Sequence, residues 1–268
     1  MQEDLFPGSS PILEIRDIQM HFGGIVALKG IRYEVPHGII QALIGPNGAG
    51  KTTLFHCISG LIQPSFGQVL FKGRRINGLL PHKIAKLGIS RTFQHVALFK
   101  SMTVLENIML GRHSRTQSGF WSTGLRLPAM RREERRILET ARSHLDFVGL
   151  EDAADLPAGT LPLGKQKILE IARAMATDPT LVLLDEPAGG LNMRETEVLG
   201  ELIQKIRARG VTVILVEHDM NLVMEIADRI LVLHYGSQLA SGTPMEIMDH
   251  PAVIEAYLGG GQMEFSEC

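Results

Sequence analysis

The sequence has only two cysteines, Cys57 and Cys268, in 268 residues. This low content excludes a disulfide-bonded scaffold and favours a reducing compartment. No uninterrupted apolar run approaches the roughly 18 residues that a membrane-spanning helix needs. The first ten residues include Glu3 and Asp4 and have no basic stretch followed by an apolar one, so they do not predict a secretory signal. These absences predict a soluble protein of the cytoplasm.

The chain also lacks an excess of charge of either sign. Its 27 Lys and Arg residues nearly balance its 29 Asp and Glu residues, which gives a net charge of −2. This balance excludes a nucleic-acid-binding protein that relies on bulk positive charge, and we expect no nucleic-acid partner. Apolar residues make up 44% of the chain, enough for a buried core. The length fits one large α/β domain or two small ones.

Short apolar runs alternate with helical patterns along most of the chain. The runs at 39–44, 180–184 and 211–216 predict strands buried on both faces. Helical patterns at 166–177 and 195–209 precede the second and the third of these runs. This alternation predicts an α/β fold with a parallel sheet covered by helices. Three further elements are predicted: a strand over 12–22, a helix over 50–59, and a hairpin formed by 230–233 and 238–240.

The middle of the chain, from about residue 91 to 157, differs from the rest because its pattern is mostly helical. We interpret it as a helical subdomain inserted into the α/β frame, which is then discontinuous in sequence. Both ends of the chain contain clustered glycines or other turn-forming residues and are predicted to be tails. The predicted division is a disordered tail at 1–10, the core with its β subdomain at 11–90 and 158–258, the helical subdomain at about 91–157, and a tail at 259–268.

Arginines cluster inside this predicted insertion, between Arg112 and Arg136. One interpretation is a solvated helical face, which the neighbouring Glu133 and Glu134 favour. The other is a surface that faces anionic lipid headgroups, where each well-placed charge contributes about 1 kcal/mol. The sequence favours the solvated face and leaves the role of residues 112–136 open.

A glycine-rich motif follows the run at 39–44. Residues 45–52 read GPNGAGKT, which fits the pattern GxxxxGK[ST]. Glycines there let backbone N–H groups surround phosphate oxygens, and the N-terminus of the following helix adds partial positive charge. Lys51 is placed to reach the terminal phosphates, and Thr52 offers a hydroxyl to Mg²⁺. The alternative is a glycine-rich turn without a ligand. The predicted phosphate-binding residues are Gly45, Pro46, Asn47, Gly48, Ala49, Gly50, Lys51, Thr52 and Thr53.

Polar residues follow the two other predicted buried strands. Asp185 and Glu186 come directly after the run at 180–184, and His218 comes after the run at 211–216. Since ligands bind at the carboxyl ends of strands in such sheets, we expect these side chains beside the phosphate loop. Asp185 is predicted to hold Mg²⁺, and Glu186 to polarise the attacking water. His218 is predicted to contact Glu186 and the γ-phosphate.

Plainer interpretations of these polar residues exist. Asp185 and Glu186 fit a solvated strand end, and His218 fits an exposed histidine, one of 10 in the chain. A metal site made of Glu217, His218 and Asp219 alone is excluded, because three consecutive residues do not all face one ion. The phosphate loop and the position of each residue at a strand end favour the functional interpretation.

Taken in order, these motifs resemble those of ATP-binding-cassette (ABC) ATPases, over about residues 12–258. The resemblance implies a P-loop NTPase core with an antiparallel β subdomain and an inserted α-helical subdomain. It implies that the chain binds ATP with Mg²⁺ and hydrolyses the nucleotide. Phe22 resembles the aromatic residue that stacks on adenine. Gln94, in the segment Arg91-Thr92-Phe93-Gln94, resembles the glutamine that touches Mg²⁺ and the attacking water and contacts the membrane subunit.

The segment that resembles the family's signature departs from the usual LSGGQ and reads Leu161-Pro162-Leu163-Gly164-Lys165. The serine hydroxyl is missing, and Pro162 lacks an N–H. Leu163, Gly164 and Lys165 remain as predicted ATP contacts, with Lys165 supplying compensating positive charge. The effect of this departure on turnover stays open. A second departure is Asn192, which stands where Asp is common in the loop that crosses to the partner.

The altered signature is similar to that of the branched-chain amino-acid importer subfamily. Further resemblance to this subfamily lies in RTFQH at 91–95, MTVLEN at 102–107 and AYLG at 256–259. The implied function is to power an importer for branched-chain or other hydrophobic amino acids. Alternatives are an importer of another small solute, such as urea or short amides, a soluble non-transport ABC ATPase, and a nucleotide-binding scaffold without turnover. Glu186 and His218 argue against the scaffold.

The resemblance also implies partners, because the family sandwiches each ATP between two cassettes and this chain carries a single set of motifs. The expected partners are a second ATPase subunit, either another copy or a sister cassette, and two integral membrane permease subunits. A solute-binding protein is expected as an indirect partner. The expected location is the cytoplasm, peripheral on the inner face of the cell membrane. Neither the solute nor the choice between homodimer and heterodimer follows from the sequence.

Overall fold

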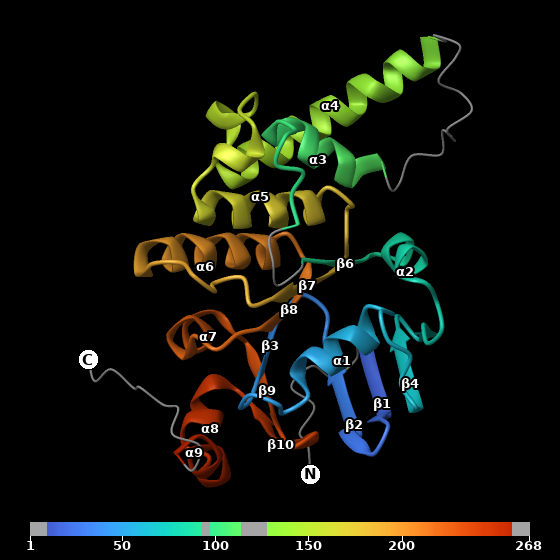
Figure 1. Cartoon of the computed structure of the whole chain (residues 1–268), viewed down its shortest axis with the longest axis vertical. Helices are drawn as coiled ribbons and strands as arrows, with labels where there is room; N and C mark the ends of the chain where they lie inside the picture. The colour runs from blue at the N-terminus through green and yellow to red at the C-terminus, as the bar shows by residue number, and fades with distance from the viewer. Residues whose placement is uncertain (1–9, 93–96, 114–127, 259–268) are drawn as a thin grey trace.

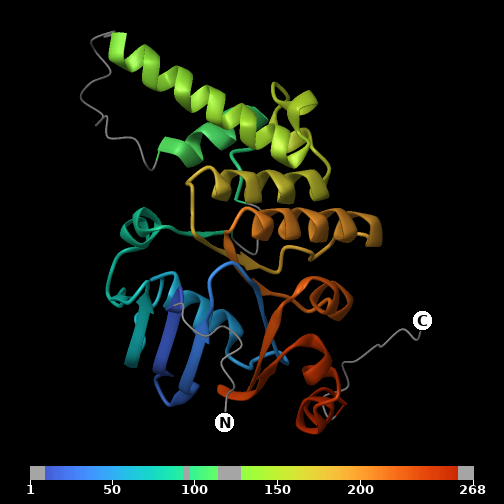
Figure 2. The ribbon, with the colours of Figure 1, turned by 180° about the vertical axis from the view of Figure 1, so that it is seen from behind.

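The computed structural model describes residues 10–92, 97–113 and 128–258. The predicted tails at 1–10 and 259–268 lie outside this range, apart from Ser10. Two sheets occupy one half of the molecule, and a layer of helices occupies the other half (Figures 1 and 2). The α/β fold predicted from the sequence, with its antiparallel β subdomain and its inserted helices, is confirmed.

The larger sheet has six strands in the order β10-β9-β3-β8-β7-β6. Neighbouring strands are parallel from β9 to β6, and β10 runs antiparallel to β9. The predicted hairpin is therefore confirmed. Tyr235 and Gly236 form its turn, and both have positive φ angles, as a two-residue turn of this kind requires. The strands are β3 (Ile40–Ile44), β6 (Ile89–Arg91), β7 (Leu181–Asp185), β8 (Thr212–Val216), β9 (Arg229–His234) and β10 (Ser237–Gly242).

The smaller sheet is antiparallel and has the order β2-β1-β4-β5. Strand β1 ends at Phe22, where Gly23 takes a φ of 57° and the chain turns back into β2. The predicted strand over 12–22 is confirmed as β1. The strands of this sheet are β1 (Leu13–Phe22), β2 (Ile25–Val35), β4 (Phe66–Phe71) and β5 (Arg74–Arg75).

Helix α1 (Lys51–Ile58) packs between the two sheets. Its Phe55 is fully buried and belongs to one apolar cluster with Leu28 of β2 and Leu183 of β7. Because this cluster joins α1 to both sheets, the N-terminus of α1 is fixed at the carboxyl end of β3. Helix α2 (Pro81–Leu87) follows the antiparallel sheet and leads into β6.

The opposite face of the parallel sheet is covered by other helices. They are α5 (Leu163–Met175), α6 (Met193–Ala208) and α7 (Met220–Ile226), whereas α3 (Val104–His113) and α4 (Pro128–Val148) pack on α5. Ile171 of α5, Leu202 of α6 and Leu222 of α7 pack with strand residues in a second apolar cluster. Helix α5 also packs on α3 and α4 through a third cluster, which contains Leu169 and Ala172. Helix α5 therefore lies between the sheet with its covering helices and the inserted helices.

The C-terminal part of the chain adds two short helices. Helices α8 (Pro244–Met248) and α9 (Pro251–Leu258) follow the hairpin and pack on β9 and β10 through a fourth apolar cluster. Ile247 of α8 and Val253 of α9 are buried in this cluster with Ile230 and Val232 of β9. The C-terminal helices therefore lie at the β10 edge of the parallel sheet (Figure 1).

The arginine-rich segment is described only in part. Residues 114–127 lie outside the described range. Arg112 forms an ion pair with Asp178, which follows α5. The division of the chain at residues 91 and 157 and the role of the arginines stay predictions.

Helix α6 begins at a reciprocal cap. The side chain of Asn192 accepts a hydrogen bond from the backbone N–H of Glu195 at 3.0 Å, and the Glu195 carboxylate accepts one from the N–H of Asn192 at 3.0 Å. Asn and Asp cap helices about equally well, so an Asp at this position would serve the helix equally.

We expect Asn192→Ala to lower the free energy of unfolding by about 1 kcal/mol, because the cap is lost. The melting temperature should fall by about 2–4 °C, and Asn192→Asp should leave it unchanged. Thermal unfolding followed by circular dichroism measures both variants. Equal melting temperatures for the Ala variant and the wild type would contradict the capping role.

Candidate functional site

The glycine-rich loop connects β3 to α1, as predicted. A Cβ atom at Gly45 would lie 2.1 Å from the carbonyl oxygen of Leu233, and one at Gly50 would lie 2.8 Å from that of Ala27. Larger residues are therefore excluded at both positions. Gly50 is the N-cap of α1 and supplies no side-chain acceptor. The first N–H groups of the helix thus keep their capacity to bind an anion.

Lys51 is buried at the start of α1. Its ammonium nitrogen donates hydrogen bonds to the carbonyl oxygens of Gly45 at 2.5 Å and Pro46 at 3.1 Å. Burial lowers the pKa of Lys51 below its usual value, and the nearby carboxylate of Glu186 offsets only part of this effect. The cation therefore lies across its own loop and within the field of Glu186, while the adjacent Thr52 is exposed.

Glu186 and His218 lie next to each other at the ends of neighbouring strands. Glu186 follows β7 and His218 follows β8, and these strands are paired in parallel. The Nε2 atom of His218 is 2.8 Å from Oε1 of Glu186, so the predicted contact between them is present. The His218 side chain is 49% exposed and that of Glu186 is 20% exposed, which leaves the pair open to water.

Asp185 has a partner that the sequence did not indicate. Its carboxylate is 2.7 Å from the guanidinium of Arg91, which also donates to the hydroxyl of Ser59 at 2.8 Å. Asp185 is buried and the Arg91 side chain is 10% exposed, so each compensates the other's loss of hydration. Arg91 lies in the same segment as Gln94, on strand β6 beside β7. Its contact with Asp185 was not predicted because the sequence did not predict strand β6.

The residues present fit a magnesium ion that arrives with a nucleotide. Within the described ranges there is no group of three or more His, Cys, Asp or Glu residues that could hold a metal ion. Mg²⁺ commonly binds through one or two protein oxygens together with substrate phosphates and waters. The hydroxyl of Thr52 and the carboxylate of Asp185 are oxygen donors of this type.

Glu217 is a buried carboxylate beside the site that was not predicted to belong to it. It accepts hydrogen bonds from the backbone N–H groups of Ala188 at 2.6 Å and His218 at 2.9 Å. Burial raises the pKa of Glu217 above its usual value, and these backbone donors offset only part of this effect. Glu217 therefore ties the loop after Glu186 to the end of β8. Its position directly before His218 in the sequence could have indicated that it lies at the site.

The remaining predicted residues lie in other parts of the molecule. Phe22 ends β1 and is 45% exposed. Leu163, Gly164 and Lys165 form the first turn of α5, whose N-cap, Pro162, has no capping side chain. Both views place α5 in the helical half and α1 among the sheets, so this turn does not complete the chain's own loop (Figures 1 and 2). Gln94 lies outside the described residues.

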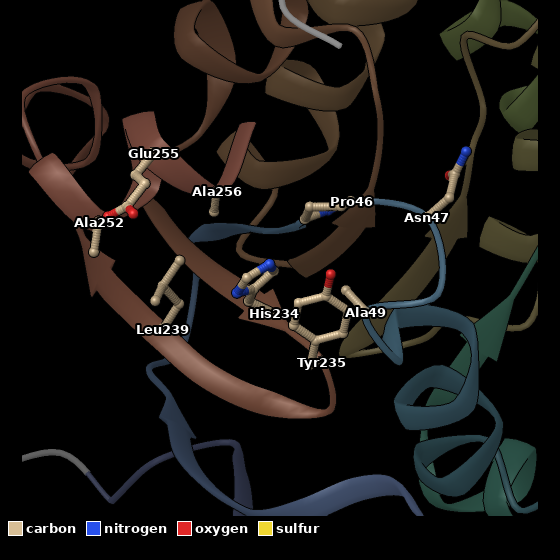
Figure 3. A pocket seen from close by; sticks show the side chains of 9 residues that line it. All are labelled: Pro46, Asn47, Ala49, His234, Tyr235, Leu239, Ala252, Glu255 and Ala256. Carbon is tan, nitrogen blue, oxygen red and sulfur yellow. The ribbon is translucent and has the colours of Figure 1, made fainter. Parts of the chain in front are cut away.

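A cavity of about 460 Å³ lies beside the glycine-rich loop (Figure 3). The loop contributes Pro46, Asn47 and Ala49 to its wall. The rest of the wall comes from the β9–β10 hairpin and from α9: His234, Tyr235, Leu239, Ala252, Glu255 and Ala256. The C-terminal helix therefore adjoins the loop.

Tyr257 of α9 provides a second link to the loop. Burial raises the pKa of Tyr257 to about 12, and a hydrogen bond with the backbone of Gly45 acts in the opposite direction. The turn at Gly236 adds a third link, because its N–H donates to the carbonyl of Ala49 at 3.0 Å. The C-terminal part of the chain thus supports the glycine-rich loop.

Comparisons with known proteins agree with this geometry. The family model described as ABC transporter matches residues 28–189. A second model, described as branched-chain amino acid ATP-binding cassette transporter, matches residues 237–262, which include the hairpin and α9.

Similar proteins cover nearly the whole chain. The high-affinity branched-chain amino acid transport ATP-binding protein BraF of Pseudomonas aeruginosa is 48% identical over 94% of this chain and 99% of its own length. The corresponding protein LivG of Escherichia coli is 45% identical over the same shares of the two chains. The crystal structure of the ADP conformation of MJ1267, an ATP-binding cassette of an ABC transporter, is 31% identical with a TM-score of 0.82, over 94% of this chain and 100% of that one. The chain therefore belongs to the ABC transporter family of ATP-binding cassettes, in its branched-chain amino acid group.

Proposed function

We propose that this chain is the ATPase subunit that powers an importer of branched-chain amino acids. The observation that carries the proposal is the 2.8 Å contact between His218 and Glu186, with the buried cation of Lys51 nearby. A carboxylate held by a histidine beside a phosphate-binding loop is suited to position a water for attack on a phosphate. The names of the similar proteins support the choice of solute.

Each residue of the site has a distinct part in the proposed reaction. Lys51 exchanges its bonds to Gly45 and Pro46 for bonds to the terminal phosphates, where it offsets negative charge. Glu186 accepts a hydrogen bond from the attacking water, and His218 keeps the Glu186 carboxylate oriented. Mg²⁺, held through Thr52 and Asp185, would neutralise phosphate charge. Gln94 is proposed to contact the same ion and water.

The proposed partners follow from the position of α5. Its first turn lies apart from the chain's own loop, so Leu163, Gly164 and Lys165 are proposed to contact the ATP of a second cassette. No helix within the described ranges is long and apolar enough to cross a membrane. Two integral permease subunits are therefore proposed to form the pore, to hold this chain at the inner face of the membrane, and to receive solute from a binding protein.

Solute uptake by cells of the source organism tests the proposal. A strain in which the chain carries Lys51→Ala is compared with the wild type for uptake of labelled leucine and of labelled urea. We expect loss of leucine uptake with urea uptake unchanged. Loss of urea uptake alone would favour the alternative importer, and unchanged uptake of both would contradict an importer of either solute.

Phe22 is proposed to stack on the adenine ring, since it is exposed at the end of β1. We expect Phe22→Ala to weaken ATP binding by about 1–3 kcal/mol, the range for a base stacked on an aromatic side chain. Binding of inorganic triphosphate, which has no base, should not change. Isothermal titration calorimetry measures both ligands, and Phe66→Ala is the matched control because Phe66 is also exposed on the antiparallel sheet. An equal loss for both ligands would contradict the stacking role.

A further inference from the structure

Lys167 is a buried cation on α5 that the proposed mechanism does not use. Its ammonium nitrogen donates a hydrogen bond to the backbone carbonyl oxygen of Glu186 at 3.2 Å. Burial lowers the pKa of Lys167 below its usual value. The carboxylates of Glu217, Glu170 and Glu186 offset only part of this effect. A buried ammonium group is retained only where such partners compensate for its lost hydration. Lys167 therefore joins α5 to the ends of β7 and β8.

The backbone that Lys167 contacts is in an unusual conformation. Glu186 has a φ of 48°, which lies in the left-handed region that side chains other than glycine rarely adopt. Its N–H donates to the carbonyl of Val216 at 2.9 Å, and its carbonyl accepts from the N–H of Gly189 at 3.2 Å. Such a conformation persists only where surrounding contacts fix it. Lys167 supplies one of these contacts.

A second contact joins the same face of α5 to the loop after Glu186. A Cβ atom built at Gly190 would lie 3.3 Å from a methyl carbon of Leu163, and one at Gly189 would lie 3.6 Å from the Lys167 nitrogen. Leu163 and Lys167 are four residues apart, so they lie on one face of the helix. The start of α5 and the loop that carries Glu186 are therefore in direct contact.

We propose that Lys167 is a positioning residue through which α5 fixes the backbone of Glu186. When Leu163, Gly164 and Lys165 engage the triphosphate of the second cassette, the resulting shift of α5 reaches this chain's own Glu186 through Lys167. Each ATP site then senses occupation of the other. This inference rests on the proposed two-cassette arrangement.

Steady-state ATP hydrolysis by the full-length chain with Mg²⁺ tests the inference. We expect Lys167→Met to lower kcat about tenfold or more, because small displacements of catalytic groups have effects of this size. The KM for ATP should stay within about twofold, since Lys167 binds the backbone of Glu186 and is not one of the proposed nucleotide contacts. The Hill coefficient should fall from above 1 toward about 1, as expected when coupling between sites is lost. Lys167→Arg should restore most of kcat and the cooperativity.

Matched variants separate positioning from stability. Lys205→Met removes an exposed lysine of α6, paired with Glu201, and should change neither kcat nor the Hill coefficient. Lys167→Gln keeps a hydrogen-bond donor without the charge, and it serves if Lys167→Met does not fold. A lower melting temperature with unchanged kcat and cooperativity in the folded Lys167 variants would overturn the inference. A wild-type chain that hydrolyses no ATP would overturn the proposed function and this inference together.

Discussion

The Glu186→Gln variant is expected to lose ATP hydrolysis by about 100-fold or more while it still binds ATP. Gln retains the size of the side chain and a hydrogen-bonding group for His218, but it cannot act as a base toward the attacking water. Removal of a general base costs about 10²–10⁴ in rate. The variant should therefore accumulate with ATP bound, in the state that precedes hydrolysis.

Two measurements check this result. A phosphate-release assay gives the rate, and size-exclusion chromatography with ATP and Mg²⁺ gives the oligomeric state. We expect the variant to elute as a dimer in the presence of ATP. Glu201→Gln is the matched control, because Glu201 is an exposed glutamate of α6 whose ion pair with Lys205 spans 3.7 Å. A monomer under all conditions would contradict the sandwich, and retained hydrolysis would contradict the role of Glu186.

The Lys51→Ala variant should bind ATP about 10- to 100-fold more weakly. Hydrogen bonds to charged groups contribute about 1.5–3 kcal/mol, and each 1.4 kcal/mol corresponds to a factor of about ten in affinity. The loss should be greater for ATP than for AMP, because Lys51 is proposed to contact only the terminal phosphates. Removing Lys51 also deletes its bonds to the loop carbonyls, so part of the loss reflects a less ordered loop.

Isothermal titration calorimetry with ATP and AMP measures this difference. Lys205→Ala serves as the control for the loss of a lysine, since Lys205 is exposed on α6. Equal affinity of wild type and Lys51→Ala for ATP would remove Lys51 from the phosphate site. An equal loss for ATP and AMP would show that Lys51 acts on the loop and not on the terminal phosphates.

Much of the frame was predictable because its signals are local. The buried strands were predicted from continuous apolar runs, and β3, β7 and β8 differ from the predicted bounds by a single residue at the ends. The helix after the glycine-rich loop and the hairpin near the C-terminus were predicted from glycine positions and periodicity. The short strand β6 was not predicted, because three residues are too few to show a period.

The contacts inside the site were less predictable. The pairing of Arg91 with Asp185 depends on β6 lying beside β7, and 94 residues separate the two side chains in the sequence. The contact of Lys167 with Glu186 and the support of the loop by α9 depend in the same way on how helices pack on the sheet. No local pattern in the sequence predicts any of these contacts.

The sequence by itself predicted the phosphate loop, the polar residues at the strand ends and the family resemblance. Each of these features depends on consecutive residues or on residues with a fixed spacing. The partners that hold these residues became known only from the packing of the elements in space. Strand pairing placed Arg91 against Asp185, and helix packing placed Lys167 against the backbone of Glu186 and α9 beside the loop. Burial and pairing of charges depend on distances between segments that are remote in sequence, and no local pattern encodes those distances.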